Sequence, residues 1–125
     1  MARTPDSRRK ALRLGHIAEW IVILYLSLKG YRILARRYIA NGGEIDVVAL
    51  RGKVVAFVEV KARPDLTTGL DAISATKIHR FAQAVDGWLM RNGWASTYTL
   101  RCDAVIIVPY RLPFHIEDAF ELPMA

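Results

Sequence analysis

The sequence has few residues that could crosslink a small protein. Its 125 residues include one cysteine, Cys102, so the chain can form no intramolecular disulfide and no cysteine-rich zinc site. The three histidines lack the short spacing of zinc ligands: His16, His79 and His115. A chain of this length forms one domain without such crosslinks. Because a lone cysteine is typical of a reducing compartment, we predict a cytoplasmic protein.

The sequence also lacks an apolar run long enough to cross a bilayer. The mainly apolar segment Ile17–Leu28 is shorter than the roughly 20 residues of a membrane-spanning helix. Glu19 interrupts it, and no small-x-small cleavage site follows. Its apolar residues recur at steps of three and four, which predicts a buried helix that ends at Lys29-Gly30. Glu19 then lies in the middle of one helical face.

Acidic residues are the scarcer charge. The 12 Asp and Glu residues are outnumbered by 18 Lys and Arg, which gives a formal net charge of +6. Much of the excess lies in Met1–Arg13, a composition that favours nucleic acid or an anionic membrane surface. A solvated, flexible terminus is the other interpretation. We therefore expect residues 1–125 to form a single domain with a basic, flexible N-terminal arm at residues 1–10.

Two strands and a tight turn occupy the middle of the chain. Glu44–Leu50 and Val54–Lys61 are rich in Val and Ile, and a turn centred on Gly52-Lys53 separates them. If these two residues form a type II′ loop, counting outward places Asp46 opposite Glu59. A three-residue loop would shift every pair by one.

The two-residue loop places two carboxylates side by side. Directly opposed residues of antiparallel strands hold their Cβ atoms about 4.5–5.5 Å apart, where like charges repel. One divalent cation would relieve the repulsion between Asp46 and Glu59, and Mg²⁺ is commonly held by one or two carboxylates. Lys61, on the same strand face, would place an ammonium beside the ion. Glu44 could instead face Lys61 in an ordinary ion pair, but this leaves Asp46 and Glu59 unexplained.

The order Asp, short hairpin, Glu-x-Lys resembles the PD-(D/E)XK nuclease signature, with Ile45 in place of proline. The chain is more similar still to the bacterial YraN-like family of restriction-endonuclease-like proteins, related in fold to archaeal Holliday-junction resolvases. The resemblance extends from about Gly15 to Phe120. It rests on these segments in order: Gly15 and Glu19, Gly30–Arg36, Gly43–Asp46, Phe57–Arg63, Arg101–Asp103, His115-Ile116 and Ala119-Phe120.

The resemblance implies a metal-dependent endonuclease that hydrolyses phosphodiester bonds in DNA, with a structure-specific substrate as one option. Asp46, Glu59 and the Val60 carbonyl would bind Mg²⁺ or Mn²⁺, and Lys61 would orient water or neutralise charge on phosphate. Glu19 would be a further catalytic residue near the metal, or a structural one that reaches an arginine or the surface. Basic residues would hold the DNA backbone: Arg8, Arg9, Lys10, Arg36, Arg63 and Lys77. Because resolvase-like relatives act on symmetric junctions, a homodimer is also implied.

The remaining segments complete the predicted fold. Tyr31–Tyr38 and Thr99–Val108 have the composition of strands, and Ser74 is a plausible cap for a second helix that ends near Asn92-Gly93. The order helix, three strands, helix, strand is that of the family. We therefore expect an α/β fold with a restriction-endonuclease-like αβββαβ core, a mixed sheet flanked by helices.

Several polar residues have two interpretations. Lys77, Arg80 and Gln83 lie off the apolar stripe of their helix, where they contact phosphates or simply face solvent. Asp103 either supports the site without binding the metal directly or pairs with an arginine. Cys102 is expected to pack in the core rather than to act as a nucleophile. Asp65–Gly69 is predicted as a polar loop, and residues 109–125 as an irregular tail with a turn at Ile116–Phe120.

Two other functions compete with the nuclease. Because fold does not entail activity, the chain could be a non-catalytic nucleic-acid-binding protein that retains the nuclease fold. A membrane-surface protein would use the basic arm and an unburied face of the first helix. Glu19 and the resemblance both oppose this third function, and we predict no membrane partner.

Overall fold

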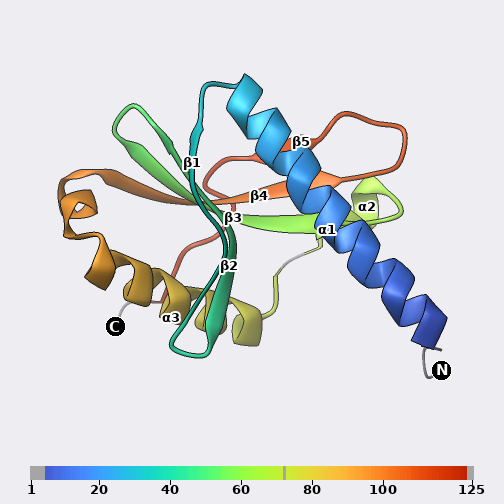
Figure 1. Ribbon diagram of the computed structural model, residues 1–125, viewed down its shortest axis with the longest axis horizontal. Helices are drawn as coiled ribbons and strands as arrows, with labels where there is room; N and C mark the ends of the chain where they lie inside the picture. Colours follow the sequence, from blue (N-terminus) through green and yellow to red (C-terminus); the bar gives the residue numbers. More distant parts are fainter. Residues whose placement is uncertain (1–4, 72, 124–125) are drawn as a thin grey trace.

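The strands of the sheet lie in the order in which they occur in the chain, β1-β2-β3-β4-β5 (Figure 1). The computed structural model describes residues 5–71 and 73–123, with side chains from residue 16 onward. The elements are α1 (Pro5–Leu28), β1 (Arg32–Ala40), β2 (Gly43–Arg51), β3 (Val54–Ala62), α2 (Leu66–Gly69), α3 (Ala75–Arg91), the 3₁₀ helix η1 (Gly93–Thr97), β4 (Thr99–Ile107) and β5 (Phe114–Ile116).

The sheet is mixed. β1, β2 and β3 are antiparallel, β4 is parallel to β3, and β5 is antiparallel to β4. The crossover from β3 to β4 contains α3, because parallel neighbours need a long connection. This arrangement confirms the predicted α/β fold, a mixed sheet flanked by helices that is consistent with a restriction-endonuclease-like αβββαβ core.

Helices α1 and α3 cover opposite faces of the sheet. Phe81 of α3 packs in a cluster with Phe57 of β3, whereas Leu26 of α1 packs in a cluster with Val58 of the same strand. Successive strand residues point to opposite faces, so the two clusters lie on opposite sides. β3 is therefore buried on both faces, which explains its nearly continuous apolar sequence.

The hairpin turn has the predicted form. Arg51 pairs with Val54, which leaves Gly52-Lys53 as a two-residue loop. Gly52 has a φ of 59°, and Lys53 does not have a positive φ, as a type II′ turn requires. The alternative three-residue loop is therefore wrong.

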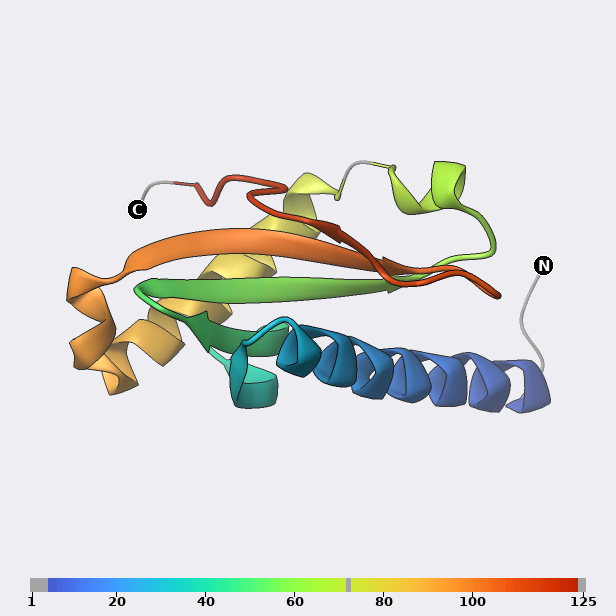
Figure 2. The ribbon, with the colours of Figure 1, turned by 90° about the horizontal axis from the view of Figure 1, so that it is seen from above.

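Helix α1 begins at Pro5, before the apolar run. Figure 2 shows its first turns extending past the strands. The side chains of residues 5–15 lie outside the described residues, and the flexible basic arm stays a prediction. After Leu28, Gly30 has a φ of 90°, in agreement with the predicted helix end. No helix in the described residues is long and apolar enough to cross a membrane.

Two segments predicted to be irregular each contain a short element, whereas the turn predicted at Ile116–Phe120 is confirmed at Glu117-Asp118. Phe114–Ile116 form β5 and pair with residues 104–106 of β4, although we expected an irregular tail. The loop after β3 contains α2, whose first turn is capped by Asp65 through a 2.7 Å hydrogen bond from the Thr68 amide. Elements of three or four residues are too short to produce a hydrophobic period, so the sequence pattern does not reveal them.

The N-terminal half of α3 packs closely against the start of β2. A Cβ atom at Gly43 would lie 1.7 Å from the carbonyl oxygen of Arg80, so a larger residue does not fit without moving the helix. Ser74 caps α3 as predicted, because its side chain accepts a hydrogen bond from the Lys77 amide at 3.2 Å. Gly43 and Ser74 together fix the first turns of α3 beside the strand that carries Asp46.

Candidate active site

Asp46 lies where the two hairpin strands separate. Backbone pairing of β2 and β3 ends at Val47 and Val58, and the next step of the register brings Asp46 opposite Glu59. There the Val60 amide donates a 2.7 Å hydrogen bond to Oδ2 of Asp46. The carboxylate thus takes the place of a backbone acceptor on β2, and its position is fixed by the strand itself.

The environment of Asp46 favours its protonated form. Burial is the main cause and the neighbouring charge of Glu59 the second, and together they raise the pKa of Asp46 to about 8. The Val60 hydrogen bond and the charge of Lys77 act in the opposite direction. Two carboxylates this close share one proton at neutral pH, or share a cation that replaces the proton.

Glu59 is the partner carboxylate and is only 3% exposed. The ammonium of Lys77 forms an ion pair with its Oε1. The geometry of that contact is not that of a hydrogen bond, so Oε1 is buried without a hydrogen-bond donor. Buried polar atoms normally have a hydrogen-bond partner, and here the Lys77 ammonium is the positive charge that neutralises the oxygen without being a hydrogen-bond donor to it.

Lys61 is also buried, at 6% exposure. Its ammonium donates 2.6 Å hydrogen bonds to the carbonyl oxygens of Gly69 and Asp71, at the end of α2. Burial lowers its pKa. Lys61 thus anchors the α2 loop beside the carboxylates, and the alternative cross-strand ion pair with Glu44 is wrong. Sequence pattern could not reveal this contact because backbone carbonyls carry no residue signature.

Two hollows adjoin the carboxylate pair. One of about 250 Å³ is lined by Glu59, Lys61, Arg63, Thr68, Asp71, Ile73, Ser74 and Lys77. The other, of about 450 Å³, is lined by residues that include Gly43, Glu44 and Arg80. Glu59, Ser74 and Lys77 line both. Glu59 and Lys77 therefore lie between the two hollows.

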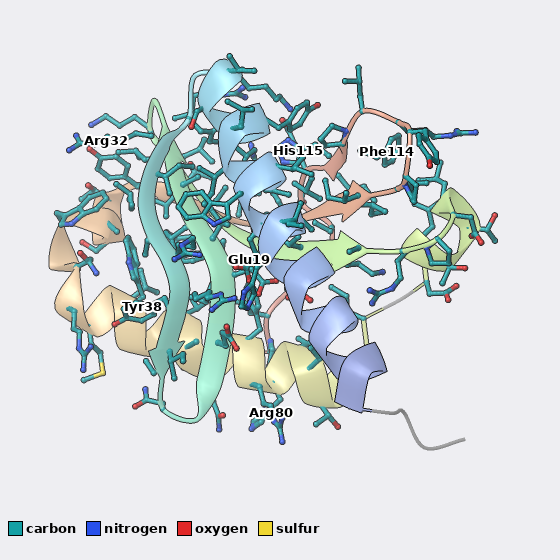
Figure 3. The ribbon with its side chains drawn as sticks, turned by 45° about the vertical axis from the view of Figure 1, so that its right-hand side comes forward. Glu19, Arg32, Tyr38, Arg80, Phe114 and His115 are labelled. Atoms are coloured by element: carbon teal, nitrogen blue, oxygen red, sulfur yellow. The ribbon has the colours of Figure 1, made fainter. Side chains whose placement is uncertain are left out.

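Glu19 reaches an arginine, as the structural interpretation expects. It is 8% exposed, and its Oε2 accepts a 2.8 Å hydrogen bond from Nε of Arg37, with Nη1 of Arg36 at 3.9 Å. Burial raises its pKa. Arg37 has a φ of 50°, a left-handed conformation that asparagine adopts more readily. Figure 3 shows Glu19 between α1 and strands β1 and β2.

The predicted nucleic-acid-binding residues fall into three groups. Arg63 and Lys77 line the hollow beside Glu59. Arg36 stacks over the ring of Trp20, with 4.5 Å between its guanidinium carbon and the ring centroid. The side chains of Arg8, Arg9 and Lys10 lie outside the described residues. Arg80, which we expected either to contact phosphate or to face solvent, is an exposed residue of α3 that lines the second hollow (Figure 3).

Asp103 and Cys102 belong to the structural core. Both oxygens of Asp103 accept hydrogen bonds from Arg101 at 2.8 Å, and His115 and the Asp118 amide contact the same carboxylate. This confirms the pairing with an arginine that was one of the two interpretations. Burial raises the pKa of the Cys102 thiol to about 12, which agrees with a packing role.

The donor set at the hairpin fits Mg²⁺ better than zinc. Among the side chains of residues 16–71 and 73–123, no three His, Cys, Asp or Glu residues converge as a metal-binding group. Two carboxylates and a strand carbonyl leave the other positions of an octahedral ion to water and phosphate, which is the usual environment of Mg²⁺. Oε1 of Glu59 fits this ligand set, because it already contacts a cation, the Lys77 ammonium, and has no hydrogen-bond donor.

Sequence comparison finds relatives along nearly the whole chain. The model of the uncharacterised protein family UPF0102 matches residues 18–107. A UPF0102 protein of Methylobacterium nodulans is 52% identical over 98% of both chains. A UPF0102 protein of Rhizobium meliloti is 48% identical over 95% of this chain and 98% of its own. One of Methylocella silvestris is 48% identical over 96% of this chain and 97% of its own.

Proposed function

The chain belongs to the uncharacterised protein family UPF0102, which is the YraN-like family, and we propose that it is a metal-dependent endonuclease acting on DNA. The observation that carries the proposal is the pair of neighbouring carboxylates, partly buried Asp46 and buried Glu59, with the ammonium of Lys61 on the same strand as Glu59. A carboxylate pair beside a lysine suits phosphodiester hydrolysis, because that reaction needs a cation to neutralise charge that develops on phosphate.

The residues of the site have distinct roles in this proposal. Asp46, Glu59 and the carbonyl of Val60 would hold Mg²⁺ or Mn²⁺, which polarises the phosphate and lowers the pKa of a bound water. Lys61 has three N–H donors and uses two on the α2 loop, so one is left to orient water or contact phosphate. Thr68 and Asp71 of the α2 loop line the hollow beside Glu59.

Glu19 and the arginines near it would act at a distance from the reacting phosphate. Arg37 holds the carboxylate of Glu19 at 2.8 Å, so in our proposal Glu19 acts on the metal through water rather than as a direct ligand. Arg63 and the basic residues of α1 would contact the DNA backbone without reading sequence. Affinity for DNA should therefore fall steeply with salt concentration.

Cleavage assays with matched variants test the proposal. The purified protein with Mg²⁺ or Mn²⁺ should cut at least one DNA among duplex, single-stranded, flapped and four-way-junction forms. Lys61→Met, which keeps the buried aliphatic stem but loses the ammonium, should reduce the cleavage rate at least about 100-fold. Circular dichroism checks that the variant is folded. Equal cleavage by the wild type and this variant would identify a contaminating nuclease and sink the proposal.

The competing function is non-catalytic binding of nucleic acid. A binding protein should show salt-sensitive DNA affinity that is the same with and without Mg²⁺ and unchanged by Asp46→Asn. The nuclease should instead lose its response to the metal in this variant. Absence of any Mg²⁺ effect in the wild type would favour the binding protein.

We propose further that the active unit is a homodimer. The outer face of α1 exposes apolar side chains at helical spacing: Ile17, Trp20, Ile21, Leu24 and Leu28. Such a contiguous stripe is unusual on a monomer's surface and suits a second copy of the same helix.

A further inference from the structure

Lys77 occupies the place of a cation beside Glu59. Its ammonium forms an ion pair with Oε1 of Glu59, the buried oxygen that has no hydrogen-bond donor. The Lys77 side chain is nevertheless 51% exposed, in contrast to the carboxylate it contacts. The contact thus neutralises a buried charge with a side chain that can leave toward solvent at low cost.

The two other cations near Glu59 already donate hydrogen bonds to backbone carbonyls. The Lys61 ammonium has donated two hydrogen bonds to carbonyls of the α2 loop, and Arg63 donates to the carbonyl of Ala62 at 2.9 Å. Lys77 comes from the capped first turn of α3 and has no such backbone contact through its side chain in the described residues. Of these three cations, Lys77 is the one whose departure breaks no hydrogen bond to the backbone.

Lys77 also lies beside two hollows into which its side chain can move. Both hollows beside Glu59 include Lys77 in their lining, and Arg80, one turn later on α3, lines the larger one. Three cations border the smaller hollow: Lys61, Arg63 and Lys77. A phosphate entering either hollow would therefore meet the Lys77 ammonium as soon as it is released from Glu59.

We propose that Lys77 is an internal counter-cation, which a divalent metal displaces from Glu59 and which then binds a phosphate of the nucleic acid. This rests on the proposed metal-dependent nuclease. The residue would hold the carboxylate in place before the metal arrives and add a positive charge to the substrate site afterwards. Metal loading and substrate binding would be coupled through one side chain, since the ammonium can contact either Glu59 or the phosphate.

Metal titration without DNA tests the displacement. Mn²⁺ binding to the full-length protein is measured from the EPR signal of the free ion. Lys77→Gln should bind Mn²⁺ about three- to tenfold more tightly than the wild type, because no ammonium competes for Glu59. Lys77→Arg should remain near the wild-type affinity. Arg80→Gln removes the same charge one turn away without touching Glu59, and it should change the affinity less than twofold.

DNA binding in the presence of Ca²⁺ tests the phosphate contact. Fluorescence anisotropy over a range of salt concentrations should show weaker binding by Lys77→Gln, with a salt slope smaller by about 0.9, the value for one lost phosphate contact. Unchanged Mn²⁺ affinity in Lys77→Gln would overturn the displacement, and an unchanged salt slope would overturn the phosphate contact. If Asp46→Asn binds Mn²⁺ as the wild type does, the metal site itself is absent and the proposed function fails with the inference.

Discussion

Four buried charged side chains in the described residues differ in how well they are partnered: Glu19, Glu59, Lys61 and Asp103. Asp103 has an arginine, a histidine and a backbone amide around it, and Glu19 has Arg37. Lys61 has two carbonyls. Glu59 has the half-exposed Lys77 ammonium and keeps an oxygen without a hydrogen-bond donor. Because a buried charge that is neutralised only by an exposed side chain is weakly compensated, this difference marks Glu59 rather than Asp103 as the place for a ligand.

The raised pKa of Asp46 has a consequence for stability. With a folded pKa of about 8, Asp46 keeps its proton in the folded protein at a pH where the unfolded chain has released it. Without metal, its contribution to the free energy of unfolding is therefore complete below about pH 4 and is lost as the pH rises toward 8. Asp46→Asn should be more stable than the wild type by about 1–3 kcal/mol at pH 8.

Urea unfolding of both proteins in EDTA, at several values of pH between 4 and 8.5, measures this difference. The advantage of Asp46→Asn should grow with pH, because the asparagine has no proton to lose. Addition of Mg²⁺ at pH 8 should raise the urea concentration at the unfolding midpoint of the wild type but not that of Asp46→Asn. If the free energy of unfolding changed with pH in the same way in both proteins, the claim that burial raises the pKa of Asp46 would be contradicted.

At the scale of elements, the site depends on one hairpin and one helix. The hairpin register follows from a two-residue turn, so it is local and was predicted by counting from Gly52-Lys53. The position of α3 against β2 is not local. It depends on the absence of a side chain at Gly43, which lets the Arg80 carbonyl approach the strand. This close approach is what brings Lys77 to Glu59.

Gly43→Ala tests the importance of that packing. The added Cβ would overlap the Arg80 carbonyl and push α3 outward, so the free energy of unfolding should fall by about 2–4 kcal/mol. Gly93→Ala is the matched control, because a Cβ at Gly93 would meet nothing within 4 Å and its φ is not positive. It should change stability by less than about 1 kcal/mol. Equal losses in the two variants, measured by thermal unfolding, would show that α3 does not need the close approach.

At the scale of the whole molecule, α1 has two different apolar sides. Its inner side contributes Val22 and Leu26 to the core, and its outer side leaves Trp20 and Leu24 more than half exposed. The sequence indicated a buried helix, and the structure confirms it for one side. The exposed side gives the proposed homodimer a contact surface that lies on the helix rather than on the sheet.

The homodimer predicts a concentration-dependent mass. Sedimentation equilibrium at about 50 μM should give twice the chain mass, since burying apolar surface contributes about 25 cal/mol per Å². Trp20→Glu with Leu24→Glu should give the single-chain mass with an unchanged far-ultraviolet spectrum, because both side chains are exposed in the single chain. A wild-type protein of single-chain mass at this concentration would rule the dimer out.

The sequence by itself determined what is set by neighbours along the chain. These features are the order of the longer elements, the type II′ turn and therefore the pairing of Asp46 with Glu59, and the Ser74 cap. Each depends on residues a few positions apart, whose geometry is fixed by backbone dihedral angles.

The tertiary structure alone decided which charges meet. Lys77 contacts Glu59, Lys61 contacts the α2 loop instead of Glu44, and Arg37 holds Glu19. These partners are not neighbours along the chain, and the sequence alone does not show which of several charged or polar groups a long side chain will contact after packing. The carboxylate pair could therefore be predicted from the hairpin, but the cation that neutralises it could not.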